Sequence, residues 1–391
     1  MGTPSTTVRT GSRRDLGNRF AVRAAITAPS LHNTQPWYFV SRNDGISVYA
    51  DFSRNLPRTD PGGRELVISC GSALFNLHLA MRHLGFVADI RMLPDPHRPD
   101  LLAEVQWGRH RRPDRYEELL FGAMTRRHTH YGPFTGRSLP PMLMAELSAA
   151  AIAERAGLAV IGDPGERRLL AELIRGAEKA ECSDTAAAGE LARWVAPVCT
   201  GRRDGVPARC RQADAVGFAD RGLFLGNGNG NGKLSIVDLD PQVTANVIGT
   251  VVLLTTRGDR RLDWLLAGRA LQRVLLHATA CDVSAAFHTQ PLELPRPRSR
   301  IQAEILAGAQ PQVLLRFGHA NHTQVTPRRP VTDVLIAREP RARMAGPAGT
   351  AGPAGPAGTA GPGRGRGSWH RPESLVADGA DGAADPMPLR V

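Results

Sequence analysis

Residues 28–37 read Ala28-Pro29-Ser30-Leu31-His32-Asn33-Thr34-Gln35-Pro36-Trp37, a polar segment enclosed by two prolines. The segment follows a helical pattern over residues 15–26 and precedes two strand patterns, 38–40 and 46–49, which Asn43-Asp44-Gly45 joins as a hairpin. Each proline fixes its own φ and disfavours helix in the residue before it, which predicts a stiff loop. The donors and acceptors of this loop suit a planar ligand rich in heteroatoms. A capped turn, with Ser30 and Asn33 bonded to local backbone, is the alternative.

The pattern Pro-Ser-x-x-Asn-x-Gln-Pro-Trp at residues 29–37 resembles the flavin-contacting loop of the nitroreductase family. With Leu31 and His32 inside it, the loop is similar to that of the Acg-like branch, the actinobacterial NAD(P)H nitroreductases. The resemblance extends from about residue 13 to residue 337. Nitroreductases are homodimers that bind FMN between subunits. The resemblance therefore implies an α+β fold made of two fused halves in one chain, each with a mainly antiparallel sheet flanked by helices.

A short internal sequence repeat agrees with an architecture of two halves. Residues 71–77 (Gly-Ser-Ala-Leu-Phe-Asn-Leu) match residues 268–274 (Gly-Arg-Ala-Leu-Gln-Arg-Val), and each stretch lies within a helical pattern that a strand pattern follows. A second helix followed by a polar loop begins near residue 116. We therefore expect halves at 13–115 and 116–337, with an insert or lid at 181–233. Residues 1–12 and the Ala/Gly/Pro-rich stretch 338–391 are expected to be disordered.

Hydrophobic periodicity and turn residues predict the other elements. The helix that begins after Asp60 has small residues at Ser69, Gly71, Ser72 and Ala73, which allow close approach of another element. The alternating Gly-Asn stretch 226–232 predicts a loop. Helices are expected at 66–84, 116–127, 142–155, 164–180, 186–196, 260–278 and 301–306, and strands at 87–93, 101–107, 158–161, 234–239, 247–256, 283–287 and 313–317.

Bulk composition favours a cytoplasmic protein that has no membrane segment. The chain has 391 residues, 42% of them hydrophobic, and contains neither a run of eighteen apolar residues nor an apolar signal region at its start. The five cysteines are scattered, without a Cys-x-x-Cys pair, so neither a zinc site nor a disulfide framework is expected, and no metal ligand is predicted.

The formal net charge of +12 comes almost entirely from arginine, because Lys179 and Lys233 are the only lysines. Neither lysine follows a suitable glycine-rich loop, which argues against Walker-type phosphate chemistry. The arginines are spread along the chain among acidic residues. Their distribution therefore does not favour a nucleic-acid-binding surface.

The resemblance assigns cofactor-binding residues. Arg126, Arg127 and Thr129 resemble the family's basic-basic-Ser/Thr grip on the flavin phosphate, and Arg328 and Arg329, between Pro327 and Pro330, resemble its C-terminal arm. A solvated basic surface is the alternative for either arginine pair. After Thr129 the chain reads His-Tyr-Gly, where Acg-like chains usually have Asn-Arg-Arg, and this removes two cations.

For the flavin ring, the resemblance points to Ser30, Asn33 and Gln35, with Pro29 and Trp37 shaping the wall and His32 facing the flavin or its substrate. The sequence contains no convincing acid–base constellation, and we assign no catalytic side chain. Hydride transfer by a flavin needs none, because the cofactor carries the electrons and solvent can supply protons.

The function that the resemblance implies is ping-pong reduction, in which NAD(P)H reduces FMN and the flavin then reduces a nitroaromatic, quinone or similar acceptor. The alternative is a protein that stores or sequesters FMN beneath a lid. A third reading is a relative that has lost the cofactor. The expected partners are therefore FMN and a small acceptor, in a monomer with internally fused halves or in a homodimer.

Overall fold

The computed structural model describes residues 13–131, 134–196, 201–207, 249–321 and 325–336. Four expectations lie outside these residues: the strand at 234–239, the Gly-Asn loop at 226–232, and the disordered ends at 1–12 and 338–391. No described helix combines the length and the hydropathy that a membrane span requires.

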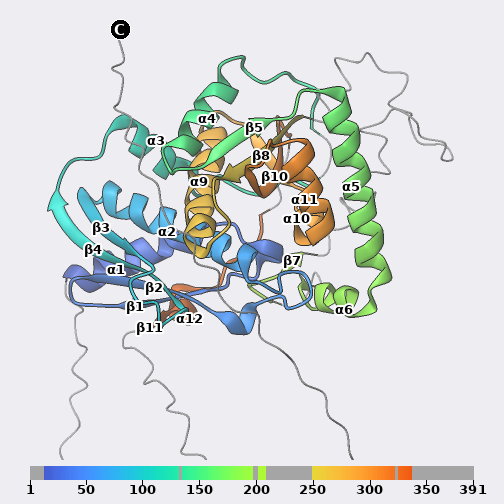
Figure 1. The fold of residues 1–391 in the computed structure, drawn as a ribbon. Helices are drawn as coiled ribbons and strands as arrows, with labels where there is room; N and C mark the ends of the chain where they lie inside the picture. Colours follow the sequence, from blue (N-terminus) through green and yellow to red (C-terminus); the bar gives the residue numbers. More distant parts are fainter. Residues whose placement is uncertain (1–12, 132–133, 197–200, 208–248, 322–324, 337–391) are drawn as a thin grey trace, which may run out of the picture. The chain divides into compact units, whose positions relative to one another are not determined.

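A five-stranded sheet combines the first part of the chain with its far end (Figure 1). Its order is β11-β1-β2-β4-β3, and every pair is antiparallel except β1 with β11. The strands are β1 (Trp37–Ser41), β2 (Gly45–Ala50), β3 (Phe86–Met92), β4 (Leu101–His110) and β11 (Leu335–Ile336). The parallel pairing of β11 brings the end of the described chain beside the strand that follows the proline-bounded loop.

The second sheet is antiparallel and has the order β5-β8-β10-β9. In β8, Val252 and Leu254 join one apolar core with α4 and α9, whereas Val251 and Leu253 join another with α5, α10 and α11. Because both faces are covered, β8 is a continuous apolar run. The elements named here are β5 (Gly157–Val160), β8 (Thr250–Thr256), β9 (Ser284–Phe287), β10 (Gln310–Gly318), α4 (Leu143–Ile152), α5 (Pro164–Ser183), α9 (Arg261–Ala280), α10 (Gln290–Glu293) and α11 (Pro295–Glu304).

Helices α2 (Arg64–His83) and α9 cross at the centre of the fold. Helix α2 packs on the first sheet and α9 on the second, and each contributes one side chain to the other's core: Ile68 joins the second core and Leu265 the first. At the crossing, a Cβ on Gly71 would lie 2.2 Å from the Leu265 carbonyl oxygen, and one on Gly268 would lie 1.9 Å from that of Ile68. Each glycine thus packs against the carbonyl three residues before the other glycine. Two identical subunits related by a two-fold axis make matching contacts of this kind.

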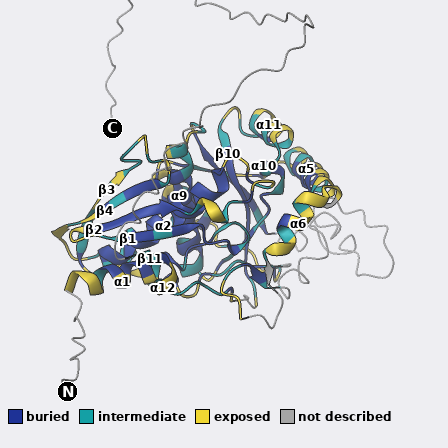
Figure 2. Cartoon of the chain, turned by 90° about the horizontal axis from the view of Figure 1, so that it is seen from below, coloured by how far each residue is buried: buried dark blue, intermediate teal, exposed yellow. Residues whose placement is uncertain are grey.

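The repeated heptapeptide therefore marks the contact between the two helices. Ser72 Oγ donates to the Gly268 carbonyl at 2.9 Å, and Gln272 Nε2 donates to Asn76 Oδ1 at 2.8 Å. The apolar periodicity of α2 predicts burial of the side that faces the first sheet. In the structure the other side is buried as well, because α9 packs against it (Figure 2). Of the four small residues predicted to allow close approach, Gly71 and Ser72 lie at this contact, whereas Ser69 lines the cavity described below and Ala73 belongs to the first core.

Most of the remaining elements match the sequence patterns, with differences mainly at their ends. The helix expected at 116–127 is Arg115–Ala123, and the one expected at 301–306 is Pro295–Glu304. Helix α6 ends at Arg193, earlier than expected, because Val195–Ala196 pair in parallel with Val206–Pro207 as β6 and β7. Helix α2 takes Gly63, in a left-handed conformation, as its N-cap, while Asp60 accepts a hydrogen bond from Leu66 N at 2.9 Å. The other described helices are α1 (Arg13–Ala25), α3 (Arg115–Ala123), α6 (Thr185–Arg193) and α12 (Val331–Val334), with 3-10 turns at Leu31–Asn33 and Phe52–Arg54.

Asp259, in the connection between β8 and α9, binds side chains from α9, α11 and β10. Its carboxylate accepts from Arg298 Nη1 and Nη2 at 2.7 and 2.8 Å, from Trp264 Nε1 at 2.7 Å and from Gln312 Nε2 at 3.1 Å. Burial favours the neutral carboxyl, but these donors outweigh it and hold the pKa of Asp259 below its ordinary value.

Asp259→Asn is therefore expected to lower the free energy of unfolding at pH 7 by about 1–2 kcal/mol. A carboxyl whose pKa is lower in the folded than in the unfolded protein contributes its full stabilisation at pH values above the unfolded pKa. That contribution is lost as the pH decreases toward the folded pKa. Urea unfolding at pH 7 and below pH 4 checks this: the difference between wild type and variant should shrink in acid. A difference that is constant with pH would contradict it.

Candidate functional site

The proline-bounded loop adopts an unusual backbone. His32, Asn33 and Gln35 have φ values of 45°, 56° and 51°, in the left-handed region that residues other than glycine rarely occupy. Ser30 Oγ accepts from Gln35 N at 2.9 Å, so part of the loop's polarity does serve a local turn. Three such residues within four positions concentrate conformational strain, which is typical of ligand-binding loops.

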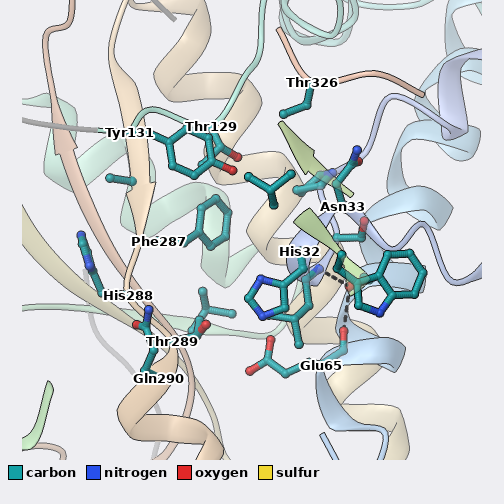
Figure 3. Close-up of a pocket in the computed structure, with 18 of the residues that line it drawn as sticks. His32, Asn33, Glu65, Thr129, Tyr131, Phe287, His288, Thr289, Gln290 and Thr326 are labelled. Atoms are coloured by element: carbon teal, nitrogen blue, oxygen red, sulfur yellow. Dashed lines mark hydrogen bonds between the residues drawn. The ribbon is translucent and has the colours of Figure 1, made fainter. Parts of the chain in front are cut away.

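This loop forms one wall of a cavity of about 190 Å³ (Figure 3). The opposite wall comes from residues 287–290, at the end of β9 and directly after it, and Glu65 and Ser69 of α2 also line the cavity. Figure 3 shows His32 and Asn33 on one side and Tyr131, Phe287 and His288 on the other. Of the predicted site residues, the cavity lining contains Pro29, Ser30, His32, Asn33, Thr129 and Arg328.

The predicted residues Arg127 and Arg328 form a pair of cations at the cavity. Arg127 Nη2 donates to the Thr27 carbonyl at 3.0 Å, and Arg328 Nη2 reaches the same oxygen at 3.4 Å. Arg127 is 3% exposed, and among the described residues no carboxylate pairs with either side chain. The Nε atoms of both guanidiniums are buried without a hydrogen-bond partner in the part of the chain that the structure describes.

Burial of these two guanidiniums destabilises their charged forms, and the pKa values of both side chains are lowered. Removal from water, reinforced by the neighbouring charge of Arg328, lowers the pKa of Arg127 to about 9. Desolvation also lowers the pKa of Arg328 to about 10. Two cations held together in low dielectric without an anion are unfavourable, so the geometry calls for an anionic ligand beside them.

The C-terminal arm and the proline-bounded loop hold one another through amide side chains. Arg328 Nη1 donates to Asn33 Oδ1 at 3.0 Å, and Asn33 Nδ2 donates to the Pro327 carbonyl at 3.0 Å. Gln35 is fully buried and lies outside the cavity lining, where its Oε1 accepts from Arg329 N at 2.8 Å. Arg329 also lies outside the lining, and its Nη2 donates to the Asp333 carbonyl at 3.0 Å.

Two further predicted residues lie away from the cavity. Arg126 is exposed and pairs with Asp282 at 3.0 Å. Trp37 is fully buried within the first core, so it supports the fold of the loop and does not form the cavity wall that was expected of it. Thr129 does reach the cavity, because its backbone bridges in parallel to Ala285 of β9.

A segment that the sequence marked as an insert covers part of the cavity. Leu191, Trp194 and Val206 line it. Asn33 Nδ2 donates to the Gly205 carbonyl at 2.9 Å, and Gln35 Nε2 donates to that of Arg203 at 2.8 Å. The described part of this insert is thus bonded directly to the proline-bounded loop.

Sequence reasoning missed several lining residues, among them the charged residues Glu65, Glu181 and Arg316. Arg316 is 1% exposed, donates from Nε to His288 Nε2 at 2.8 Å and lies 5.3 Å from the Phe134 ring centroid. Its position inside the apolar run of β10 was the available signal, because a charge in a buried strand needs a specific partner. Glu65 pairs with Arg64 at the start of α2, and burial raises the pKa of its carboxyl.

No family model matches the chain. The Mycobacterium tuberculosis protein named "Putative NAD(P)H nitroreductase Rv3131" is 32% identical over 323 residues, which cover 81% of this chain and 90% of that protein. "Putative NAD(P)H nitroreductase acg" of the same organism is 29% identical over 326 residues, 81% of this chain and 95% of its own length.

Among solved structures, the FMN-dependent nitroreductase NfnB of Mycobacterium smegmatis in complex with NADPH aligns with 57% of this chain and 99% of its own. It is 15% identical, and the TM-score is 0.33. A BluB-like flavoprotein from Clostridium difficile aligns with 56% of this chain and 99% of its own, at 11% identity and a TM-score of 0.36. Since the relative at 32% identity aligns over nearly its whole length, the chain belongs to the nitroreductase family, in its Acg-like branch.

Proposed function

We propose that this protein is an FMN-dependent oxidoreductase that takes electrons from NAD(P)H and delivers them to a nitroaromatic, quinone or similar acceptor in a ping-pong cycle. The observation that carries the proposal is the Arg127–Arg328 pair, whose buried Nε atoms have no partner among the described residues. The curated relatives named NAD(P)H nitroreductases support the class of reaction.

The donor set fits FMN. A phosphate is a dianionic acceptor with several oxygens, and Arg328 with the Thr129 and Thr326 hydroxyls offers cationic and neutral donors along one side of the cavity. Arg127 lies behind this side and adds positive potential. Pro29, Ser30, His32 and Asn33 would hold the isoalloxazine ring from one wall of the cavity, with Phe287 on the opposite wall. Bound FMN supplies the hydride chemistry, and the residues of the chain orient it and exclude water.

A second candidate function, sequestration of FMN without turnover, is favoured by one observation. Trp194 and Val206 cover the cavity from a segment that hydrogen-bonds to the proline-bounded loop. The guanidiniums of Arg54 and Arg202 lie over the Trp194 ring, 5.2 and 5.8 Å from its centroid. A cover held in this way would deny a nicotinamide access to the flavin face.

Visible spectroscopy of the purified protein with added FMN, before and after anaerobic NADPH, distinguishes these functions. For an oxidoreductase we expect a bound-flavin band that bleaches with NADPH and returns when an acceptor is added. A band that persists under excess NADPH would favour sequestration. Failure to bind FMN at all would overturn both proposals.

A further inference from the structure

We infer that Glu146, His277 and Cys281 form a binding site for one divalent, borderline-soft metal ion such as Zn²⁺, on the surface formed by α4 and α9. A Glu146 carboxylate oxygen, a ring nitrogen of His277 and Cys281 Sγ all lie within 4.8 Å of one another. In a tetrahedral site with metal–ligand bonds of about 2.0–2.3 Å, ligand atoms are separated by about 3.3–3.8 Å. Small side-chain rotations therefore bring the three groups around one ion.

The helices place these ligands without strain. Cys281 N donates to the His277 carbonyl at 3.1 Å, which keeps the helical hydrogen bond at the end of α9. His277 and Cys281 are thus four residues apart on one helix face, where side chains meet. Leu143 and Leu147, buried against α9, hold Glu146 in position on α4.

The outer contacts of His277 are those of a metal ligand. Its Nε2 lies 3.1 Å from Glu146 Oε2, and its Nδ1 lies 3.0 Å from the Tyr116 hydroxyl on α3. A ligating histidine commonly donates its second ring nitrogen to a neighbouring acceptor, which fixes the ring orientation. Tyr116 supplies that acceptor and leaves Nε2 directed at Glu146.

The electrostatics and the exposure of the cluster also suit a cation. Asp282 follows Cys281 directly in the chain, so a second carboxylate lies near the thiol. The nearby cations have carboxylate partners of their own: Arg126 pairs with Asp282, and Arg273 pairs with Glu154 and also lies over the Tyr116 ring, 5.4 Å from its centroid. Glu146 is 51% exposed, so an ion can reach the cluster from solvent.

The chemistry of the donors selects the class of metal. Sulfur, imidazole nitrogen and one carboxylate are the ligands of zinc and similar transition metals, whereas Mg²⁺ and Ca²⁺ take oxygen. Three protein ligands leave one tetrahedral position for water. Because α9 leads through Asp282 into β9, an ion here would anchor the wall of the flavin cavity that β9 begins.

The test uses Co²⁺ as a spectroscopic substitute for Zn²⁺ on the full-length protein after removal of metal by chelator dialysis. We expect a thiolate-to-cobalt charge-transfer band that saturates at one equivalent and is displaced by Zn²⁺. Cys281→Ser should abolish the band, and Glu146→Gln, at an exposed position, should weaken Co²⁺ affinity at least tenfold. Zn²⁺ should raise the thermal unfolding midpoint of wild type but not that of Cys281→Ser.

His83→Gln is the matched control. His83 Nδ1 lies 2.9 Å from Glu118, so this pair reproduces the histidine–carboxylate contact without a cysteine. Its loss should leave the cobalt band and the zinc-induced stabilisation unchanged. The inference is overturned if wild type gives no thiolate band, if the band survives in Cys281→Ser, or if Glu146→Gln binds Co²⁺ as wild type does. None of these readouts depends on FMN binding or turnover.

Discussion

Arg127→Met is expected to weaken FMN binding about 10- to 100-fold while leaving the ligand-free protein as stable as wild type, or more stable. Hydrogen bonds and ion pairs to a charged group contribute about 1.5–3 kcal/mol, and each 1.4 kcal/mol is a factor of ten in affinity. Without FMN the same guanidinium is a desolvated charge beside Arg328, and within the described residues its one side-chain hydrogen bond is to the Thr27 carbonyl at 3.0 Å. Methionine keeps much of its length and removes the repulsion.

Flavin fluorescence titration and urea unfolding of the FMN-free protein measure the two effects. Arg126→Met is the matched control, because this neighbouring arginine is exposed and paired with Asp282. Its affinity for FMN should stay within about twofold of wild type if only the buried cations matter. An Arg127→Met protein that unfolds more easily and still binds FMN normally would show that the guanidinium has a structural role instead.

Gly268→Ala is expected to produce the largest loss of stability of any single methyl addition to α9, about 3 kcal/mol or more in free energy of unfolding. The new Cβ would lie 1.9 Å from the Ile68 carbonyl oxygen and 2.8 Å from Gly71 Cα. Both are backbone atoms of α2, so the clash can be relieved only by moving one helix away from the other. That movement would open the contact between the two cores.

Gly176→Ala provides the comparison. Gly176 lies within α5 and has no atom within 4 Å of an added Cβ, so the substitution should stabilise the protein by about 0.5–1 kcal/mol through helix propensity. Chemical denaturation of the two variants should therefore show changes of opposite sign. Equal effects would mean that the crossing can relax and that the close approach is not essential.

Local patterns in the sequence predicted most of the elements, because helical periodicity, caps and turn residues act over short distances. Asp163 with Pro164 does begin a helix, and Asn43-Asp44-Gly45 does form the turn between β1 and β2. The polar face of α2 was not predicted as buried, since Ser72 and Asn76 find their partners on a helix about 196 residues later.

At the candidate site, too, local patterns did not predict the residues that long-range contacts bring together. The loop at residues 29–33 was predicted from its own residues, whereas Arg316 and residues 286–290 reach the cavity only through the second sheet. The resemblance to the flavin-contacting loop pointed to Gln35 as a ring contact, whereas the structure uses both ends of its amide in contacts within the chain. The cluster of Glu146, His277 and Cys281 could not be recognised from cysteine spacing, because Glu146 and His277 come from different helices.

The crossing of α2 and α9 also bears on how such a chain can change over generations. In an assembly of two identical subunits, one codon change at a crossing glycine alters both sides of the contact together. Here Gly71 and Gly268 are separate positions in one gene, so each can be tested by selection alone while its mate stays fixed. The sequences of the two halves can therefore diverge at positions away from this contact. A segment that lines the cavity in one half, such as the one with Trp194, needs no equivalent in the other half.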